Sequence, residues 1–321
     1  MQKIDIVACL DKGFVMPTAV MMYSVCINNK DIDIDFHIVI DESVTEVDQN
    51  NIVRTISGFS GKKSVFYKVT SQLTASFPLF KGIHITKSAY YRLYLSEILP
   101  ETIEKILYLD GDIIVRHSLL TLWNTELTDY AIGATIDWAE GLDETYDRLC
   151  YPRQKRYFNT GVMLINLSYW RSNNLVEKFV DYTQKYPERI KYVDQDVLNV
   201  ILLDKIYLLP IKYNFQTGFL RDVSEKDLKK VDKETRDSLN DPIIVHFTEG
   251  RKPWLANVHH PHPYCSTFYK YQKQTIYWNK QKKFSILRQM LNKTKWYLAD
   301  FLRFTRIIEP IKTFHNIKPI D

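Results

Sequence analysis

The sequence contains little glycine, no paired-cysteine motif and no long hydrophobic run. Only 10 of its 321 residues are glycine, which argues against a long flexible linker. It has no run of roughly 18 apolar residues, the length at which a transmembrane helix is expected. Its cysteines lack Cys-x-x-Cys spacing, so we expect neither a zinc site nor a disulfide framework. They are Cys9, Cys26, Cys150 and Cys265.

The overall composition is that of an ordinary globular protein. Hydrophobic residues make up 45% and charged residues 25% of the chain, which excludes the disordered, collagen-like and disulfide-scaffold classes. A length of 321 residues fits one large α/β domain with an appendage. Asp5 stands where a secretory signal peptide would have apolar residues, so we expect the protein in the cytoplasm.

Positive charge is concentrated at one end of the chain. Residues 270–321 hold 12 Lys and Arg against 3 Asp and Glu, a net charge of +9. The other residues hold 31 basic and 35 acidic side chains, a net charge of −4. This asymmetry favours an anionic partner for the C-terminal segment, either a membrane or a nucleic acid.

Hydrophobic patterning predicts an alternation of strands and helices, which is typical of a mainly parallel sheet. The first five elements are expected as strand, helix, strand, helix and strand at 4–10, 16–29, 34–40, 44–57 and 64–69. Later strands are expected at 105–109, 131–136, 161–167, 206–209 and 243–247. Later helices are expected at 87–98, 168–186 and 194–203. Residues 221–240 are polar and charged, and we expect a surface helix or loop there.

Chemically reactive side chains follow several of the predicted strands. In an open parallel sheet, ligands bind where the carboxyl ends of the strands meet. Each of five residues lies at or just beyond a predicted strand end, and we expect them near one another. They are Asp11, Asp110, Asp112, Asp137 and His246.

The strongest single motif is Asp110-Gly111-Asp112, which follows the apolar strand at 105–109. Two carboxylates held this close repel each other unless a cation lies between them. Their hard oxygen ligands suit Mg²⁺ or Mn²⁺. On the triplet alone, a solvated surface turn is the alternative interpretation.

Five sequence blocks, in the same order, resemble those of the family 8 glycosyltransferases. They are SAYYRLYLSEILP (88–100), YLDGD (108–112), FNTGVMLINLSYWR (158–171), DQDVLN (194–199) and HFTEGRKPW (246–254). The resemblance runs from residue 4 to about residue 255 and looks most like bacterial lipopolysaccharide galactosyl- and glucosyltransferases. It implies an α/β GT-A fold, which is a Rossmann-like nucleotide-sugar-binding fold. It also implies retaining chemistry with a UDP-sugar and Mn²⁺, for which Mg²⁺ is a possible substitute.

The resemblance also implies a metal site and a diphosphate site. Asp110 and Asp112 match the metal-binding acids of the family, and His246 matches its third ligand. Lys252 resembles the lysine that binds the diphosphate, where it would act as a point charge. The family usually has glycine three residues after the histidine, whereas this chain has Glu249.

The nucleotide and the donor sugar are expected to contact other matching positions. Cys9, Asp11 and Phe14 resemble the uridine-binding segment, in which Asp11 would accept a hydrogen bond from uracil and Phe14 would stack on it. With Asp110, Gly111, Asp112 and Lys252 they form the expected nucleotide site. For Asp11 a helix N-terminal acid is the alternative. The expected donor-sugar residues are Arg92, Asp137, Asn159, Asp194 and Gln195.

The pair Asp194-Gln195 is expected to be catalytic. In the family, the matching glutamine lies near the anomeric carbon and the acid lies close by. An amide is a poor nucleophile, so Gln195 fits the stabilisation of oxocarbenium charge better than attack. A covalent intermediate and a same-face internal return both stay open.

We therefore expect a GT-A catalytic domain at 1–255 and a basic, aromatic extension at 256–321. Trp296, Phe301 and Phe304 recur in the extension at roughly helical spacing with basic residues nearby, as in helices that lie on a membrane surface. The alternatives are a helix packed on the main domain and nucleic-acid binding, and we favour an anionic membrane without nucleic acid. The protein would then be peripheral on the inner face of the cell membrane.

The predicted function is metal-dependent transfer of galactose or glucose from a UDP-sugar to a lipopolysaccharide or another glycan or glycolipid acceptor, with retention. One alternative is a catalytically silent homologue that binds a nucleotide sugar or a glycan. The intact acids and His246 argue against it. A metal-dependent phosphohydrolase is a second alternative, but the sequence lacks a convincing nucleophile motif for it.

Overall fold

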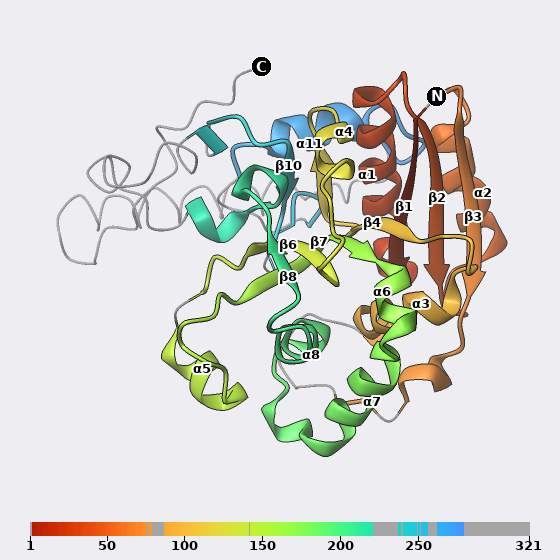
Figure 1. Cartoon of the computed structure of the whole chain (residues 1–321). Coiled ribbons are helices and arrows are strands. Elements are labelled where there is room, and N and C mark those ends of the chain that lie inside the picture. The colour runs from red at the N-terminus through yellow and green to blue at the C-terminus, as the bar shows by residue number, and fades with distance from the viewer. Residues whose placement is uncertain are drawn as a thin grey trace, which may run out of the picture.

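A computed structural model describes most of the chain up to residue 278. The described residues are 2–75, 77–78, 87–140, 142–220, 237–238, 240–248, 250, 252–255 and 262–278. The fold is built around a seven-stranded sheet with the strand order β3-β2-β1-β4-β7-β6-β8 (Figure 1). Its strands are β1 (Lys3–Leu10), β2 (Asp33–Ile40), β3 (Lys62–Lys68), β4 (Lys105–Leu109), β6 (Ile132–Ile136), β7 (Phe158–Asn166) and β8 (Ile206–Leu208).

The sheet is mainly parallel, as predicted, but one strand runs the other way. β1 pairs in parallel with β2 and β4, and β2 pairs in parallel with β3. β7 is antiparallel to both of its neighbours, β4 and β6. The amino end of β7 therefore lies at the same edge of the sheet as the carboxyl ends of β4 and β6.

Side chains alternate across β1 because successive residues of a strand point to opposite faces. Ile4 and Ile6 belong to the core that the sheet forms with α1 (Val15–Asn28) and α2 (Glu46–Ile56). Val7 belongs to the core on the other face, which is covered by a second set of helices. These are the 3-10 helix η3 (Lys87–Tyr94) and the α-helices α3 (Leu95–Ile98), α6 (Leu167–Ser172), α7 (Leu175–Lys185) and α8 (Val193–Ile201).

Local sequence signals account for the start of α2. Thr45 accepts a hydrogen bond from the backbone N–H of Asp48, and the Asp48 side chain accepts one from the backbone N–H of Thr45. This reciprocal capping box satisfies backbone donors that a helix otherwise leaves without partners. The remaining α-helices of the described chain are α4 (Leu120–Trp123), α5 (Asp143–Leu149) and α11 (Cys265–Gln272).

A small second sheet brings His246 to the main one. β10 (Ile244–His246) is antiparallel to β5 (Ile113–Val115) and parallel to β9 (Phe215–Gln216). His246 pairs with Ile113, the residue directly after Asp112. The sequence predicts a strand ending near His246 but misses β5 and β9, because strands of three and two residues carry almost no periodic signal.

Two predicted helices differ in detail from the structure. Residues 168–186 form two helices, because Asn174 adopts a left-handed φ of 50° between α6 and α7. Asparagine tolerates this conformation better than most residues do. The stretch 87–98 is helical, but most of it is the 3-10 helix η3. Most of the polar stretch 221–240 lies outside the described residues.

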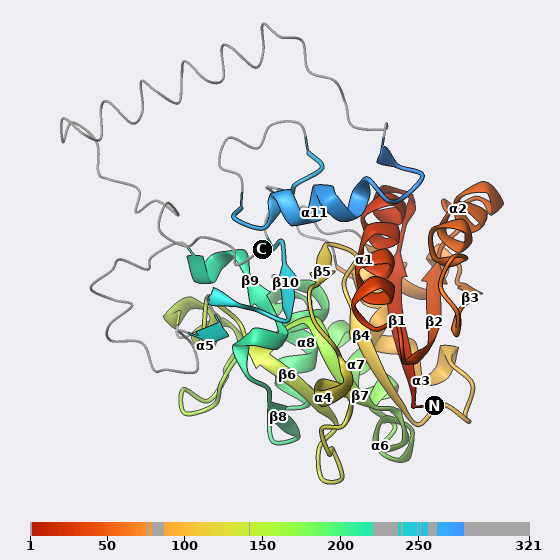
Figure 2. The ribbon, with the colours of Figure 1, turned by 90° about the horizontal axis from the view of Figure 1, so that it is seen from above.

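The first part of the predicted extension packs onto the main body. α11 lies against α1 (Figure 2), and its Phe268 is fully buried in a cluster with Val245 and Phe247. Tyr277 is buried as well. Residues 279–321, which carry most of the predicted membrane-binding segment, lie outside the described residues. No helix within the described part of the chain is both long and apolar enough to cross a membrane.

Candidate active site

A cavity of about 500 Å³ opens at the edge where the carboxyl ends of β1, β4 and β6 meet the amino end of β7. All of the predicted site residues except Asp11 line this cavity. Side chains from distant parts of the sequence therefore converge here, as the strand-end rule predicts. The arrangement differs from the prediction in one respect, since His246 comes from the small sheet.

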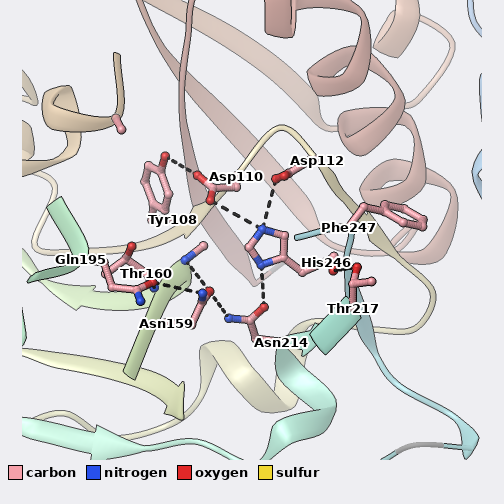
Figure 3. A network of polar contacts seen from close by, with 12 residues as sticks. Tyr108, Asp110, Asp112, Asn159, Thr160, Gln195, Asn214, Thr217, His246 and Phe247 are labelled. Atoms are coloured by element: carbon pink, nitrogen blue, oxygen red, sulfur yellow. Dashed lines mark hydrogen bonds and ion pairs between the residues drawn. The ribbon is translucent and has the colours of Figure 1, made fainter. Parts of the chain in front are cut away.

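Asp110, Asp112 and His246, the predicted cation ligands, form a compact group (Figure 3). One ligand atom from each lies within 4.8 Å of the others. His246 Nε2 is 3.2 Å from Asp112 Oδ1 and 3.7 Å from Asp110 Oδ2. Two carboxylates and an imidazole are a donor set that fits Mn²⁺, and the carboxylates also suit Mg²⁺.

Gly161 leaves the space in which this group forms. A Cβ atom at this position would lie 2.1 Å from His246 Cε1 and 2.9 Å from Asp110 Oδ2. The Gly161 carbonyl also accepts a hydrogen bond of 2.8 Å from the backbone N–H of Asp110. β7 therefore passes so close to the cation ligands that only a residue without a side chain fits.

The second oxygen of Asp110 is held from the opposite side. Tyr108 Oη and Arg92 Nη2 each donate to Asp110 Oδ1 at 2.9 Å, and the Arg92 guanidinium lies over the Tyr108 ring. Asp110 Oδ2 is thereby left facing His246. Burial opposes the charge on Arg92, but Asp110 and Asp194 outweigh it and raise the pKa of Arg92.

Arg92 also connects the cation ligands to the predicted catalytic pair. Its Nε lies 3.3 Å from Asp194 Oδ2, which accepts a further hydrogen bond of 2.8 Å from Thr160 Oγ1. Asp194 is almost fully buried. Burial raises the pKa of Asp194 to about 6, and the charge of Arg92 opposes that rise.

Lys252 contacts the other motif acid. Its Nζ lies 2.5 Å from Asp112 Oδ2 and donates to the Phe247 carbonyl oxygen. Burial favours the neutral form of Asp112, but Lys252 and His246 outweigh it and hold the pKa of Asp112 well below its usual range. A positive side chain thus stands beside the acids, at the position predicted for the diphosphate. Glu249, where the chain departs from the family pattern, lies outside the described residues.

The predicted sugar-binding side chains form one hydrogen-bonded group. Asn159 Nδ2 donates to Asp137 Oδ2 at 2.9 Å and to Gln195 Oε1 at 3.1 Å. Gln195 Nε2 donates to Asp137 Oδ2 at 3.2 Å, and the Thr160 backbone N–H donates to Gln195 Oε1 at 3.3 Å. Amides and carboxylates offer the paired donors and acceptors that match sugar hydroxyls.

Comparison with known proteins identifies the family. The family model described as glycosyl transferase family 8 matches residues 5–258, most of the chain. The chain belongs to glycosyl transferase family 8. It is therefore a glycosyltransferase, and the predicted family is confirmed.

Individual relatives agree with this family 8 assignment. The lipopolysaccharide 1,2-glucosyltransferase of Escherichia coli is 30% identical and covers 76% of this chain and 71% of its own. General stress protein A of Bacillus subtilis is 29% identical and covers 85% of this chain and 94% of its own. A crystal structure of the galactosyltransferase LgtC with donor and acceptor sugar analogues is 27% identical. It has a TM-score of 0.74 and covers 85% of this chain and 96% of its own, which confirms the GT-A fold.

A buried acid holds the turn before the predicted catalytic pair of this family 8 enzyme. Asp196 Oδ2 accepts hydrogen bonds from the backbone N–H groups of Lys191 and Tyr192, each at 2.7 Å, and from Arg148 Nη1 at 2.8 Å. Its Oδ1 accepts from Tyr157 Oη at 2.7 Å, and the residue is fully buried. Asp196 is thus occupied by structural contacts and does not face the cavity.

This turn carries backbone strain next to the predicted catalytic pair. Val193 has a φ of 49°, a conformation that a β-branched residue rarely adopts and that costs about 1–3 kcal/mol. The contacts of Asp196 hold the chain in this conformation. Asp194 and Gln195, which follow directly, point into the cavity as a result.

The predicted nucleotide end of the cavity contains Cys9 and Phe14. Burial raises the pKa of the Cys9 thiol to about 12, so at neutral pH it is a protonated wall residue and no nucleophile. The Phe14 ring packs edge-on against Trp254 with 6.3 Å between the ring centres. Trp254 thus holds the loop that carries Lys252.

Asp11 lies outside the lining of the cavity. Its Oδ1 accepts a hydrogen bond of 2.8 Å from the Gly13 backbone N–H and caps the short 3-10 helix η1 (Lys12–Phe14). This geometry agrees with the alternative interpretation of Asp11 as a helix N-terminal acid. A contact between Asp11 and uracil stays a prediction.

Sequence reasoning misses four residues that support the site: Tyr108, Thr160, Gly161 and Asn214. The first three lie inside the matching sequence blocks, which is the signal that points to them. Asn214 stands in no block, and only the tertiary structure brings it beside His246.

Proposed function

We propose that the protein is a metal-dependent retaining hexosyltransferase. It would move galactose or glucose from a UDP-sugar to a lipopolysaccharide or another surface glycan. One observation carries the proposal: the cation ligands Asp110, Asp112 and His246 share a single cavity with the connected amide and carboxylate group around Asn159. A nucleotide sugar needs both features at once, a site for its diphosphate and a site for its hydroxyl groups.

The diphosphate end of the proposal rests on charge. A divalent cation held by Asp110, Asp112 and His246 would stabilise the negative charge of the departing UDP. Lys252 Nζ lies 2.5 Å from Asp112 Oδ2 and supplies a further positive charge beside the predicted cation site. Stabilisation of this kind contributes several kcal/mol in comparable sites, roughly 3–4 kcal/mol for a single oriented donor.

The sugar end rests on hydrogen-bonding geometry. The Asp137 carboxylate and the Asn159 amide lie side by side, with 2.9 Å between Asp137 Oδ2 and Asn159 Nδ2. Together they can bind neighbouring hydroxyl groups of a hexose. Galactose and glucose differ in the orientation of one hydroxyl group, so both remain in the proposal. Arg92 would act mainly on Asp110 and Asp194, since its guanidinium is engaged by both.

Retention requires the acceptor to attack from the face that UDP leaves. Asp196 is unsuited as a nucleophile because protein groups hold both of its oxygens and it is fully buried. The Gln195 oxygen is held by Asn159 and Thr160, which orients it but leaves it an amide oxygen of low nucleophilicity. We propose that Gln195 and Asp194 stabilise positive charge on the sugar.

The relatives support the proposed acceptor class. The Escherichia coli relative is a lipopolysaccharide 1,2-glucosyltransferase, and a Salmonella typhimurium relative of 28% identity is a lipopolysaccharide 1,3-galactosyltransferase. Trp138 and Tyr192 line the cavity beside Asp137 and Gln195, and flat aromatic rings suit the apolar face of an acceptor sugar. We therefore propose a saccharide acceptor at this end.

The test is release of UDP from UDP-galactose and from UDP-glucose, each with and without Mn²⁺. We expect slow hydrolysis of one donor, dependent on the metal, and faster turnover with a suitable acceptor. Asp110→Asn and Asp112→Asn should abolish turnover while the thermal unfolding curve stays cooperative. Asp204→Asn removes an exposed acid at the surface, and it should behave like wild type.

Two results would contradict the proposal. Binding of UDP-sugar without any turnover would identify a catalytically silent homologue. Wild-type turnover in Asp110→Asn or Asp112→Asn would remove these acids from the metal site.

We also propose that residues 279–321 attach the enzyme to the inner face of the cell membrane, which is anionic. The segment holds ten Lys and Arg against three Asp and Glu, with the aromatic residues Trp296, Phe301 and Phe304 among them. Each basic residue near such a surface contributes about 1 kcal/mol of attraction, so partial engagement is enough for reversible binding.

A shortened chain tests this attachment, and it should end after residue 278 because Phe268 and Tyr277 belong to the core. Both lengths should release UDP, but only the full chain should sediment with anionic vesicles, and salt should release it. Equal sedimentation of the two lengths would contradict a membrane-binding role for the segment.

A further inference from the structure

Asn214 is a fully buried amide that lies between a cation ligand and the sugar-binding group. Its Oδ1 is 2.9 Å from His246 Nδ1, and its Nδ2 donates to Asn159 Oδ1 at 2.8 Å. Figure 3 shows this continuous path from His246 through Asn214 to Asn159. It comes from three separate elements of the fold, the strand β10, the loop before β9 and the strand β7.

The direction of every hydrogen bond along the path follows from one backbone group. The Gly161 backbone N–H donates to Asn159 Oδ1 at 3.0 Å, and a backbone N–H can only donate. The Asn159 oxygen therefore faces Gly161 and Asn214. Asn214 must present its NH₂ group to that oxygen, and its own carbonyl oxygen is thereby turned toward His246.

A second backbone group requires the same orientation of Asn159. The Thr160 N–H donates to Gln195 Oε1, so this oxygen is an acceptor, and Asn159 must meet it with its NH₂ group. The same NH₂ group donates to Asp137 Oδ2, an acceptor when ionised. Two independent anchors therefore fix the orientation of the amide on which that of Asn214 depends.

We propose that Asn214 is a positioning residue that holds His246 in the tautomer with its proton on Nδ1. An acceptor oxygen at 2.9 Å requires a donor on Nδ1, so Nε2, which faces Asp110 and Asp112, is the nitrogen left to bind a metal. The inference rests on the proposed cation site. It adds that the nitrogen of His246 that can bind a metal is selected by a residue outside the family motifs.

The two ends of the Asn214 amide have separable roles. The oxygen serves the cation ligand, and the NH₂ group serves Asn159 on the sugar side. Asn214→Asp keeps an acceptor for the Nδ1 proton but puts two oxygens face to face at Asn159. Asn214→Leu is close in size and removes both interactions.

The experiment measures Mn²⁺ binding by titration calorimetry without sugar or nucleotide. Partners of a metal-binding histidine contribute about 10- to 100-fold in metal affinity, so we expect Asn214→Leu to bind Mn²⁺ more weakly by that factor. Asn214→Asp should bind Mn²⁺ at least as tightly as wild type, yet turn over UDP-sugar poorly. A role of Asn214 in folding alone would not produce this difference between Mn²⁺ affinity and turnover in the two variants.

Asn29→Leu is the matched control, because Asn29 is also a buried asparagine with two hydrogen bonds. It donates to the Val25 carbonyl oxygen and accepts from the Leu119 backbone N–H, away from the cavity. The Asn29→Leu variant should lose free energy of unfolding in urea, as Asn214→Leu does. Its Mn²⁺ affinity should stay at the wild-type value.

A second readout reports the tautomer itself. With ¹⁵N-labelled histidine, the ring signals of His246, assigned through a His246→Gln variant, should show a protonated Nδ1 in metal-free wild type. Asn214→Asp should preserve this pattern. Asn214→Leu should shift the ring toward the Nε2-protonated form.

The outcomes separate this inference from the proposed function. Failure of wild type to bind Mn²⁺ would overturn the cation site and the inference with it. Wild-type Mn²⁺ affinity in a folded Asn214→Leu variant would overturn the inference and leave the cation site standing. An unprotonated Nδ1 in metal-free wild type would also overturn it, and this result does not depend on the folding of any Asn214 variant.

Discussion

Gly161→Ala should damage the cation site through the added Cβ atom, and not through a backbone conformation that alanine avoids. Gly161 does not have a left-handed φ, so alanine can adopt its backbone conformation. The added Cβ would lie 2.1 Å from His246 Cε1, where ordinary van der Waals contact begins at 3.4 Å. The His246 imidazole and the strand β7 must therefore move apart by about 1.3 Å in total. Overpacking of this kind typically costs about 1–3 kcal/mol of stability.

A displacement of this size exceeds what the site tolerates. The hydrogen bond between His246 Nδ1 and Asn214 Oδ1 is 2.9 Å long, and a shift of the imidazole ring by most of 1.3 Å would break it. A misplacement of about 1 Å can cost about 100-fold in turnover. We expect Gly161→Ala to lower kcat by about 100-fold and Mn²⁺ affinity by about 10-fold or more.

The assay compares Gly161→Ala with Gly133→Ala. Gly133 lies on the neighbouring strand β6, and a Cβ atom added there would lie 3.4 Å from its nearest atom, which is an ordinary contact. Both variants are measured for Mn²⁺ binding by calorimetry, metal-dependent UDP release and thermal unfolding. Gly133→Ala should resemble wild type in all three. Equal Mn²⁺ affinity and turnover in the two variants would refute the argument that Gly161 makes room for His246.

Three further predictions concern other parts of the cavity. The pKa of Asp194, raised to about 6, means that between pH 4 and 6 the folded protein holds a proton that the unfolded chain releases. Stability should therefore fall by up to about 3 kcal/mol as pH rises from 4 to 7, and Asp194→Asn should remove this loss in urea unfolding at several pH values. Lys252→Ala should weaken UDP-sugar binding more than uridine binding, and equal losses by calorimetry would reject a diphosphate contact. Gly218→Ala places a Cβ 2.0 Å from the Trp138 ring, so it should impair transfer to the acceptor but preserve Mn²⁺ binding; unchanged transfer would remove Trp138 from the acceptor end.

Local patterns in the sequence predict the main elements of the fold. β1, α1, β2, α2 and β3 lie within about two residues of their predicted ranges, because long amphipathic or buried segments leave a clear periodic signal. β5 and β9 are too short for such a signal, and they form only because β10 lies between them. The break at Asn174 is likewise invisible to periodicity, which continues across it.

The sequence also locates most of the cavity, since acids that follow strands must meet at one edge of a parallel sheet. Asp110 and Asp137 reach it in this way, at the ends of β4 and β6. Asn159 reaches the same edge for a different reason, the reversed direction of β7, which the sequence pattern does not reveal. Its role could be predicted only from the matching family block.

Residue types and strand ends in the sequence thus determine which chemistry this protein has available: two motif acids, a histidine, a lysine and a set of amides. The tertiary structure alone decides how these groups are held. It places Gly161 against His246, Arg92 between Asp110 and Asp194, and Asn214 behind the imidazole. These contacts join residues that are up to 102 positions apart in the chain, from Arg92 to Asp194, and they depend on which strands become neighbours. A local sequence pattern does not record that choice, because it follows from the packing of the whole sheet.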